Sequence, residues 1–245
     1  MPLRAAAQPS RSSIRLYRQL HYGTLADFYV LDTRQYRSLT EPCGYGTGPI
    51  CPAVLDPART MLGDQQENWL FNGLGKSRAR WNVLAQQVPI TRLDVGGPSE
   101  PEYKLDKWDA YPFARARLLR FLAEARVKNP VVITGDLHDA WVAHLKPDFD
   151  DPASPVVASE FVGTSISSDG DGAASSEDGI AVAANGRNPH VIFHNYRRGY
   201  SVCHVSRSEW RTDFRTVPFV SAPGAPLGTV ASFVLEDGQP AAQPA

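Results

Sequence analysis

The segment Asn129-Pro-Val-Val-Ile-Thr-Gly-Asp-Leu-His138 decides the fold class of this chain. Its short, continuous apolar run at 130–134 is typical of a strand buried on both faces of a sheet. The preceding residues 111–127 alternate apolar and arginine positions at helical spacing. The side chains that this helix would direct toward the core are Leu118, Leu119, Leu122 and Ala125. Those it would direct toward solvent are Arg115, Arg117 and Arg126. A helix followed by a buried strand indicates an α/β fold.

Weaker patterns on both sides extend this prediction. Residues 14–20 and 27–31 favour a pair of strands, and 81–86 a further strand. A helix should start at about Asp64, which would cap it. The C-terminal third predicts a meander of short strands near 156–163, 190–195, 200–205, 210–217 and 229–235. Two further segments, Ser167 to Arg187 and the last seven residues, are predicted to be a mobile loop and a frayed end.

Length, charge and hydropathy favour a single domain and argue against a nucleic-acid-binding surface or a membrane span. The 245 residues suffice for one large domain, and we expect a single domain over 1–245. The 25 Lys plus Arg residues balance 26 Asp plus Glu, and no basic run suggests a nucleic-acid surface. No apolar run has the roughly 18 residues of a membrane span. The N-terminal residues lack the apolar core of a secretory signal.

Two cysteines bracket a glycine-rich loop, Cys43-Gly-Tyr-Gly-Thr-Gly-Pro-Ile-Cys51. This loop is flexible enough to bring the two sulfur atoms together, so we predict a disulfide between Cys43 and Cys51. Such a pair favours an oxidising compartment. The alternatives are two ordinary loop thiols or part of a metal site. Cys203 would remain unpaired.

The buried strand ends on a possible pair of metal ligands. Asp136 and His138 are two residues apart, and in an extended segment they would point to the same side. Ligand sites of open α/β sheets lie beyond the carboxyl ends of strands, and an oxygen and a nitrogen donor suit a metal cation. The alternative is that Asp136 caps a short helix over 140–145 and His138 packs on it.

A series of motifs, taken in order, resembles the alkaline phosphatase D (PhoD-like) family. The likeness runs from about residue 11 to about residue 240, and its specificity comes from the order of the motifs rather than from any one of them. The motifs are Leu31-Asp-Thr-Arg-Gln-Tyr-Arg37, the Cys43/Cys51 loop, Arg59-Thr-Met-Leu-Gly63, Trp81-Asn-Val-Leu-Ala-Gln-Gln87, Trp108-Asp-Ala-Tyr-Pro112, Thr134-Gly-Asp-Leu-His138, Glu160-Phe-Val-Gly-Thr-Ser-Ile-Ser-Ser168, Asn188-Pro-His190 and Arg198-Gly-Tyr200.

The resemblance implies a calcineurin-like metallophosphoesterase fold, a sandwich of two mixed sheets flanked by helices. It implies hydrolysis of phosphomonoesters or phosphodiesters, with small-molecule phosphate esters as substrates and iron and calcium as cofactors. It places Asp136 and His138 in the metal site. It also implies an exported protein, periplasmic or extracellular, that uses the twin-arginine route.

The chain departs from the family pattern in what it lacks. Family members carry upstream ligand motifs of the Gly-Asp-Tyr and Asp-Asp-His-Glu type and a small β-sandwich domain, and the sequence contains neither motif. We therefore expect the C-terminal portion of a PhoD-like domain, with the missing N-terminal half as a possible partner. The alternative function is a non-catalytic remnant that serves as a binding or interaction domain.

Other polar residues could extend the site. Arg34, just after a predicted strand, could contact phosphate; the alternative is a salt bridge that orders the long loop. His190 and His194 would share a face of a strand and could add metal ligands, or could be ordinary strand histidines. Glu160 could be a ligand, although a buried, hydrogen-bonded role is favoured. No catalytic residue is assigned.

Overall fold

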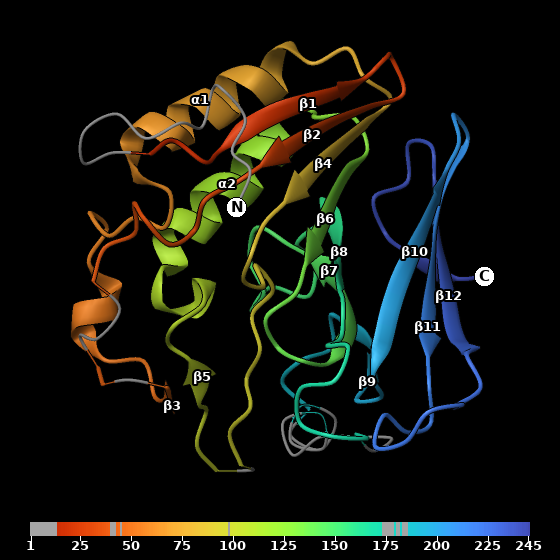
Figure 1. Ribbon diagram of the computed structural model, residues 1–245. Helices are drawn as coiled ribbons and strands as arrows, with labels where there is room; N and C mark the ends of the chain where they lie inside the picture. The colour runs from red at the N-terminus through yellow and green to blue at the C-terminus, as the bar shows by residue number, and fades with distance from the viewer. Residues whose placement is uncertain are drawn as a thin grey trace.

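The computed structural model describes residues 14–39, 43, 44, 46–97, 99–172, 179, 182 and 186–245. Its layers are a pair of helices, a seven-stranded sheet and a four-stranded sheet, in that order (Figure 1). The helical elements are α1 (Gly63–Lys76), α2 (Pro112–Glu124) and the 3-10 turns η2 (Pro52–Leu55) and η3 (Trp108–Ala110). The strands are β1 (Arg18–Tyr22), β2 (Ala26–Val30), β3 (Thr47–Gly48), β4 (Trp81–Ala85), β5 (Tyr103–Lys104), β6 (Pro130–Thr134), β7 (Ala140–Leu145), β8 (Ala158–Val162), β9 (Val191–Asn195), β10 (Gly199–Val205), β11 (Glu209–Thr216), β12 (Gly228–Glu236) and β13 (Gln243–Pro244).

Strand β6 is the central strand of the large sheet, whose order is β1-β2-β4-β6-β8-β7-β9. Strands β2, β4, β6 and β8 run parallel, while β1 and β7 pair antiparallel with their neighbours. Val131 and Val132 are fully buried, and Ile133 is partly buried. The prediction of an α/β fold around a buried central strand is confirmed. The carboxyl ends of four parallel strands therefore meet at one edge, where ligand sites of such sheets lie.

Helices α1 and α2 cover one face of the large sheet (Figure 1). They bury Leu70, Leu74, Leu118, Leu119 and Leu122 in one cluster with sheet residues such as Val132. Three details of the predicted helices are wrong. Asp64 lies inside α1 rather than capping it, Arg115 is buried, and Ala125 is exposed. Arg115 turns inward because its guanidinium pairs with the buried carboxylate of Asp109.

The four-stranded sheet β10-β11-β12-β13 covers the other face of the large sheet (Figure 1). Trp210, Phe214 and Phe233 pack in one cluster with Trp81 and Val131 of the large sheet. The predicted C-terminal meander is thus confirmed for β10 to β12, whereas β8 and β9 belong to the large sheet. The prediction that the last seven residues fray is wrong, because β13 pairs with β12.

Two further expectations concern the loops beside β6. Residues 140–145 form strand β7, not a short helix. The predicted mobile loop from Ser167 to Arg187 lies partly outside the described residues. Strand β7 runs between β8 and β9, so the chain reverses direction directly after His138.

Candidate metal and phosphate site

The turn that follows β6, here called the Asp136–His138 turn, has an unusual backbone. Asp136 has φ 75° and His138 has φ 62°, so both adopt the left-handed conformation that non-glycine residues rarely take. The expectation that an extended segment points both side chains the same way is therefore wrong. The helix-cap alternative for Asp136 is also wrong, because a strand follows. A non-glycine backbone held in this region is found where the surroundings enforce it, often at functional sites.

Two cations from distant parts of the chain hold the Asp136 carboxylate. Arg34 Nη2 donates to Oδ1 at 2.9 Å, and Lys107 Nζ donates to Oδ2. Lys107 Nζ also donates to Asp106 Oδ2 at 3.0 Å. The side chains of Arg34 and Asp136 are 41% and 25% exposed, so solvent reaches both, whereas the Lys107 side chain is largely buried. One carboxylate thus gathers residues from the loop after β2, from the start of η3 and from the end of β6.

The loop that carries Arg34 is shaped without help from the Arg34 side chain. Asp32 Oδ1 accepts hydrogen bonds from the backbone N–H of Arg34 and of Gln35, both at 3.0 Å. Gln66 Oε1 accepts the backbone N–H of Asp32 at 2.8 Å. The Arg34 side chain forms an ion pair with Asp136, which agrees with the salt-bridge alternative; a phosphate contact by Arg34 stays a prediction. Its guanidinium crosses to a residue 102 positions away.

His138 is held at its ring and at its backbone. Its Nδ1 lies 2.7 Å from Asp169 Oδ2. Its carbonyl oxygen accepts hydrogen bonds from Thr164 Oγ1 at 2.8 Å and from Arg198 Nη1 at 2.7 Å. Both side chains of the turn are thus tied to segments that lie far away in the sequence.

The other predicted site residues lie apart from this turn in separate hydrogen-bond networks. His190 Nε2 donates to Arg92 O at 2.7 Å, and burial lowers the pKa of His190 to about 4. His194 Nε2 lies 2.9 Å from Asp139 Oδ2. These hydrogen bonds of the two rings go to the Arg92 carbonyl and to Asp139 rather than to Asp136 or His138. A role of His190 and His194 as metal ligands stays a prediction.

Glu160 is a fully buried acceptor that joins β6 and β8 to a loop. Its carboxylate accepts the backbone N–H of Ile90 at 2.9 Å, the backbone N–H of Thr91 at 2.8 Å and Thr134 Oγ1 at 2.7 Å. Burial raises its pKa, although these three donors act in the opposite direction. This matches the favoured prediction of a buried, hydrogen-bonded glutamate.

Asp136 and His138 have the donor atoms that a metal ion requires, but two ligands are too few for a catalytic metal site. A carboxylate oxygen and an imidazole nitrogen suit iron, zinc or manganese. Within the described ranges, however, no group of three or more His, Cys, Asp or Glu side chains is placed to hold a metal ion. A catalytic cation normally takes at least three protein ligands. The described residues therefore supply part of a metal site at most.

Cys43 and Cys51 form a disulfide with Cα atoms 5.7 Å apart, inside the range that such bonds require. The bridge closes the loop that precedes η2, and Cys43 packs against the cluster beneath the helices. Cys203 is a free thiol.

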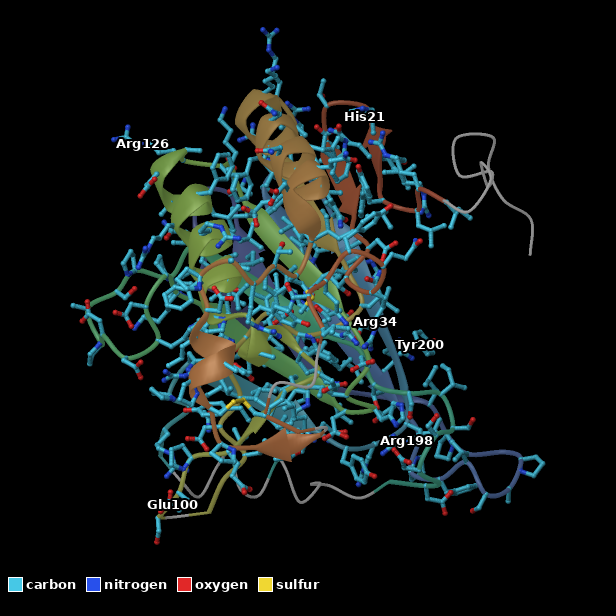
Figure 2. All side chains as sticks on the ribbon, turned by 90° about the vertical axis from the view of Figure 1, so that its left-hand side faces the viewer. His21, Arg34, Glu100, Arg126, Arg198 and Tyr200 are labelled. Carbon is cyan, nitrogen blue, oxygen red and sulfur yellow. A yellow bond between two sulfur atoms is a disulfide. The ribbon has the colours of Figure 1, made fainter. Side chains whose placement is uncertain are left out.

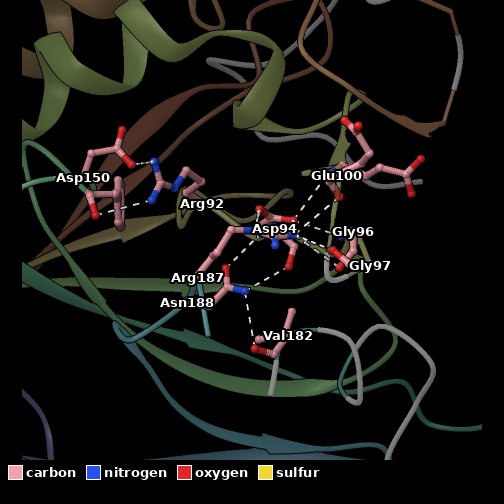
Figure 3. Close-up of polar contacts among 11 residues, drawn as sticks. Arg92, Asp94, Gly96, Gly97, Glu100, Asp150, Val182, Arg187 and Asn188 are labelled. Atoms are coloured by element: carbon pink, nitrogen blue, oxygen red, sulfur yellow. Dashed lines mark hydrogen bonds and ion pairs between the residues drawn. The ribbon is translucent and has the colours of Figure 1, made fainter. Parts of the chain in front are cut away.

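A second carboxylate cluster, which the sequence analysis missed, lies around Asp94 (Figure 3). Arg187 pairs with both carboxylate oxygens of Asp94, and its Nη2 also donates to Gly97 O at 2.9 Å. Asn188 adds a reciprocal pair of bonds: its Oδ1 accepts Asp94 N and its Nδ2 donates to Asp94 O, both at 2.9 Å. Lys107 was missed as well. No sequence pattern predicts the Asp94–Arg187 or the Asp136–Lys107 contact, because each joins segments that are far apart in the chain.

The family model described as PhoD-like phosphatase matches residues 1–214 of this chain. The chain belongs to the PhoD-like phosphatase family. It is 44% identical over 239 residues to alkaline phosphatase D of Bacillus subtilis (strain 168), a match that covers 98% of this chain and 40% of the relative. A solved structure of PhoD superposes with a TM-score of 0.90 at 42% identity, covering 100% of this chain and 46% of that one.

Membership of the PhoD-like family confirms the resemblance found in the motifs. The chain spans less than half the length of either relative, which is consistent with the expected partial coverage of the family. Within the described part of the chain, no helix combines the length and apolarity needed to cross a bilayer.

Proposed function

We propose that this chain contributes Asp136 and His138 to the metal site of a phosphoric ester hydrolase that acts on phosphomonoesters or phosphodiesters. The observation that supports this most is the Asp136–His138 turn: two metal-type donors lie at the carboxyl end of the central strand, in a strained backbone, beside two cations. Iron and calcium are the proposed metals. Small phosphate esters are the proposed substrates.

Arg34 and Lys107 are the proposed phosphate contacts. A guanidinium presents a planar fork that matches two oxygens of a phosphate, and an ammonium supplies a point charge with three donors. Both groups already bind oxygens of one carboxylate, so their spacing suits an oxyanion. A metal held by Asp136 would share the charge of this carboxylate, so that Arg34 and Lys107 would be available to hold substrate oxygens. Asp106 would keep its hydrogen bond to Lys107.

Bound metal would supply an activated water and neutralise charge on the phosphate oxygens. The residues of this chain would do the positioning. Asp169 orients the His138 ring through Nδ1, which leaves Nε2 as the nitrogen for a ligand bond. The cations would hold the ester, and the carbonyl bonds at His138 would keep the turn fixed.

The alternative is that the chain alone is a non-catalytic binding domain. The specific observation in its favour is the donor count, because no three His, Cys, Asp or Glu side chains of the described residues are placed to hold a metal ion together. On our proposal the remaining ligands come from a polypeptide corresponding to the part of the relatives that this chain does not match. That polypeptide is also its proposed partner.

Export to the periplasm or the cell exterior is proposed as well. The Cys43–Cys51 disulfide supports it, because disulfides persist in oxidising compartments and are rare in the cytosol of mesophiles. Thiol counting on protein isolated from its native host tests this directly. One reactive thiol, from Cys203, is expected; three reactive thiols would argue against export.

Reconstitution tests the proposed activity. The chain is produced together with the unmatched part of the Bacillus subtilis relative, and hydrolysis of p-nitrophenyl phosphate and bis-p-nitrophenyl phosphate is measured with iron and calcium supplied. We expect turnover by the mixture and background rates for the chain alone. Asp136→Asn should abolish the turnover, whereas Asp150→Asn, a matched change at an exposed carboxylate, should leave it unchanged.

Two results would count against the proposal. Turnover that survives Asp136→Asn would remove this residue from the metal site. A correctly assembled mixture without turnover on either ester would favour the binding-domain alternative.

A further inference from the structure

Arg198 is a buried arginine beside the Asp136–His138 turn. It directly precedes β10, the strand that starts the four-stranded sheet, and its exposed fraction is 0%. Figure 2 labels Arg198 and Arg34, and the two arginines contact different parts of the turn. Arg34 reaches the Asp136 carboxylate, whereas Arg198 reaches the backbone of His138.

The guanidinium of Arg198 makes contacts with neutral oxygens. Nη1 donates to His138 O at 2.7 Å and to Ser165 Oγ at 2.6 Å, and Nη2 donates to Tyr196 O. Its Cζ also lies 4.2 Å from the centroid of the Tyr196 ring. Among the described residues, Arg198 has no carboxylate in ion-pair contact. A buried charge is costly without good partners, so its donors must be well placed to be tolerated.

Gly172 packs against the Arg198 side chain, and Gly199, the next residue after Arg198, packs against β11. A Cβ on Gly172 would lie 2.9 Å from Nε and Nη2 of Arg198 and 2.3 Å from Tyr196 O, so only glycine fits there. A Cβ on Gly199 would lie 1.9 Å from Arg215 O. The backbone at residue 172 therefore lies directly against the guanidinium of Arg198, while the backbone at residue 199 is fixed against that of Arg215.

The same carbonyl is held a second time from another segment. Thr164 Oγ1 donates to His138 O at 2.8 Å, and Gly199 N donates to Ser165 O at 3.0 Å. These bonds join the end of β8, the start of β10 and the turn after β6 into one unit. A left-handed residue such as His138 persists only where its surroundings over-determine it.

We propose that Arg198 is a positioning residue that locks His138 in its left-handed conformation and thereby aims the Asp136–His138 turn. Only the expected effect of Arg198 on catalysis rests on the proposed function. The effect of Arg198 on the conformation of His138 is a property of this chain alone. Arg198 does not contact the substrate or a metal. It acts through the carbonyl of His138 and couples the four-stranded sheet to the site.

The test is nuclear magnetic resonance of the chain labelled with ¹³C at its histidine rings and ¹⁵N at its backbone. The chain has six histidines, and a His138→Gln variant assigns the signal of His138. The variants are Arg198→Met, Arg198→Lys and Thr164→Val. The control is Arg211→Met, an arginine of the same sheet whose side chain pairs with Asp213 instead.

Arg198→Met should shift or broaden the His138 ring signal and speed amide exchange over residues 136–139 by at least about tenfold. Arg198→Lys should give a smaller change, since one ammonium can still reach a single carbonyl. Arg211→Met should leave both readouts at the parent value. In the reconstituted enzyme, the rate should fall in the order parent, Arg198→Lys, Arg198→Met.

An unchanged His138 signal and unchanged exchange in folded Arg198→Met would overturn the proposal. Equal changes in Arg211→Met would also overturn it, because they would reflect general loosening of the sheet. If Arg198→Met does not fold, the same two readouts are measured on Arg198→Lys and Thr164→Val. Thr164→Val removes the hydrogen bond from Thr164 to the His138 carbonyl, which is the oxygen that Arg198 also binds. A parent-like His138 signal and parent-like amide exchange in both variants would refute the proposal. The magnetic resonance result stands whether or not phosphatase activity is found.

Discussion

Asp94 and Asp136 are both aspartates held by basic side chains from distant loops, yet they are built differently. The Asp94 side chain is 2% exposed and is held by Arg187, by the backbone N–H of Gly96 and by that of Glu102. The Asp136 side chain is 25% exposed, and its described partners are the ends of two flexible side chains. The contacts of Asp94 therefore include fixed backbone groups, whereas the contacts of Asp136 come from side chains alone. On our proposal, a ligand would replace the contacts of Asp136.

The electrostatics of Asp94 agree with a structural role. Burial alone would raise the pKa of its carboxyl group, but the hydrogen bonds from Arg187, Gly96 and Glu102 outweigh burial and lower it. A carboxylate that gains this much from its partners contributes to folding stability. Backbone N–H groups hold the Asp94 carboxylate, whereas side chains hold that of Asp136. We therefore expect loss of the contacts at Asp94 to lower the free energy of unfolding much more than loss of the contacts at Asp136.

The largest expected effect comes from removing the partner of Asp94. Arg187→Met leaves a buried carboxylate without this cation, and we expect the free energy of unfolding to fall more than for the other substitutions proposed here. Urea unfolding followed by tryptophan fluorescence measures this. A loss below about 1 kcal/mol would place Asp94 in the same class as an exposed ion pair.

The same substitution has a predicted pH dependence. Because the folded-state pKa of Asp94 is lowered, its stabilising contribution is complete above the ordinary value of about 3.9 and is lost as the pH falls through the lowered pKa. The stability difference between parent and Arg187→Met should therefore be largest near neutral pH and shrink below about pH 3.9. A difference that stays constant down to pH 3 would show that the contact does not depend on charge.

A medium effect is expected from the backbone of the turn. At φ 75°, glycine avoids the steric cost of a Cβ, so Asp136→Gly should be more stable than Asp136→Ala by about 1 kcal/mol. Both variants lose the carboxylate, so their difference isolates backbone strain. Equal unfolding free energies would mean that the turn relaxes out of the left-handed region when the carboxylate is lost.

The smallest effect on stability is expected for Asp136→Asn. Asparagine tolerates the left-handed conformation, Lys107 keeps its bond to Asp106, and Arg34 can turn to solvent. We expect a change of only about 0.5 kcal/mol in the unfolding free energy. A loss as large as that of Arg187→Met would make Asp136 a structural residue.

The sequence predicts the layers of the fold well because they rest on local patterns. The apolar run of β6 and the spacing of α2 are readable without any partner, and both elements are where the patterns place them. Arg115 shows the limit: helical spacing assigns it outward, but a buried carboxylate six residues earlier draws it in. Position on a helix does not reveal such a partner.

For the candidate site, the sequence names Asp136 and His138, whose role as metal ligands stays a prediction, and it does not give their geometry. Asp136 and His138 stand out as donors after a buried strand, yet an i, i+2 rule for extended chains does not apply to a left-handed turn. Lys107 lies in none of the sequence motifs, and Arg198 appears only in the family motif Arg198-Gly-Tyr200, which does not reveal its contacts. Their roles arise from contacts 29 and 60 residues apart in the sequence, which only the folded chain brings together.

One measurement separates a role in catalysis from a role in stability for Asp136 and Asp94. In the enzyme reconstituted with the unmatched part of the relative, the rate of bis-p-nitrophenyl phosphate hydrolysis per folded molecule is determined for Asp136→Asn and for Asp94→Asn. The account predicts at least about a 100-fold loss for Asp136→Asn with stability kept, and a rate near the parent value for Asp94→Asn with stability reduced. Full activity in Asp136→Asn, or an equal loss of activity per folded molecule in both variants, would contradict it.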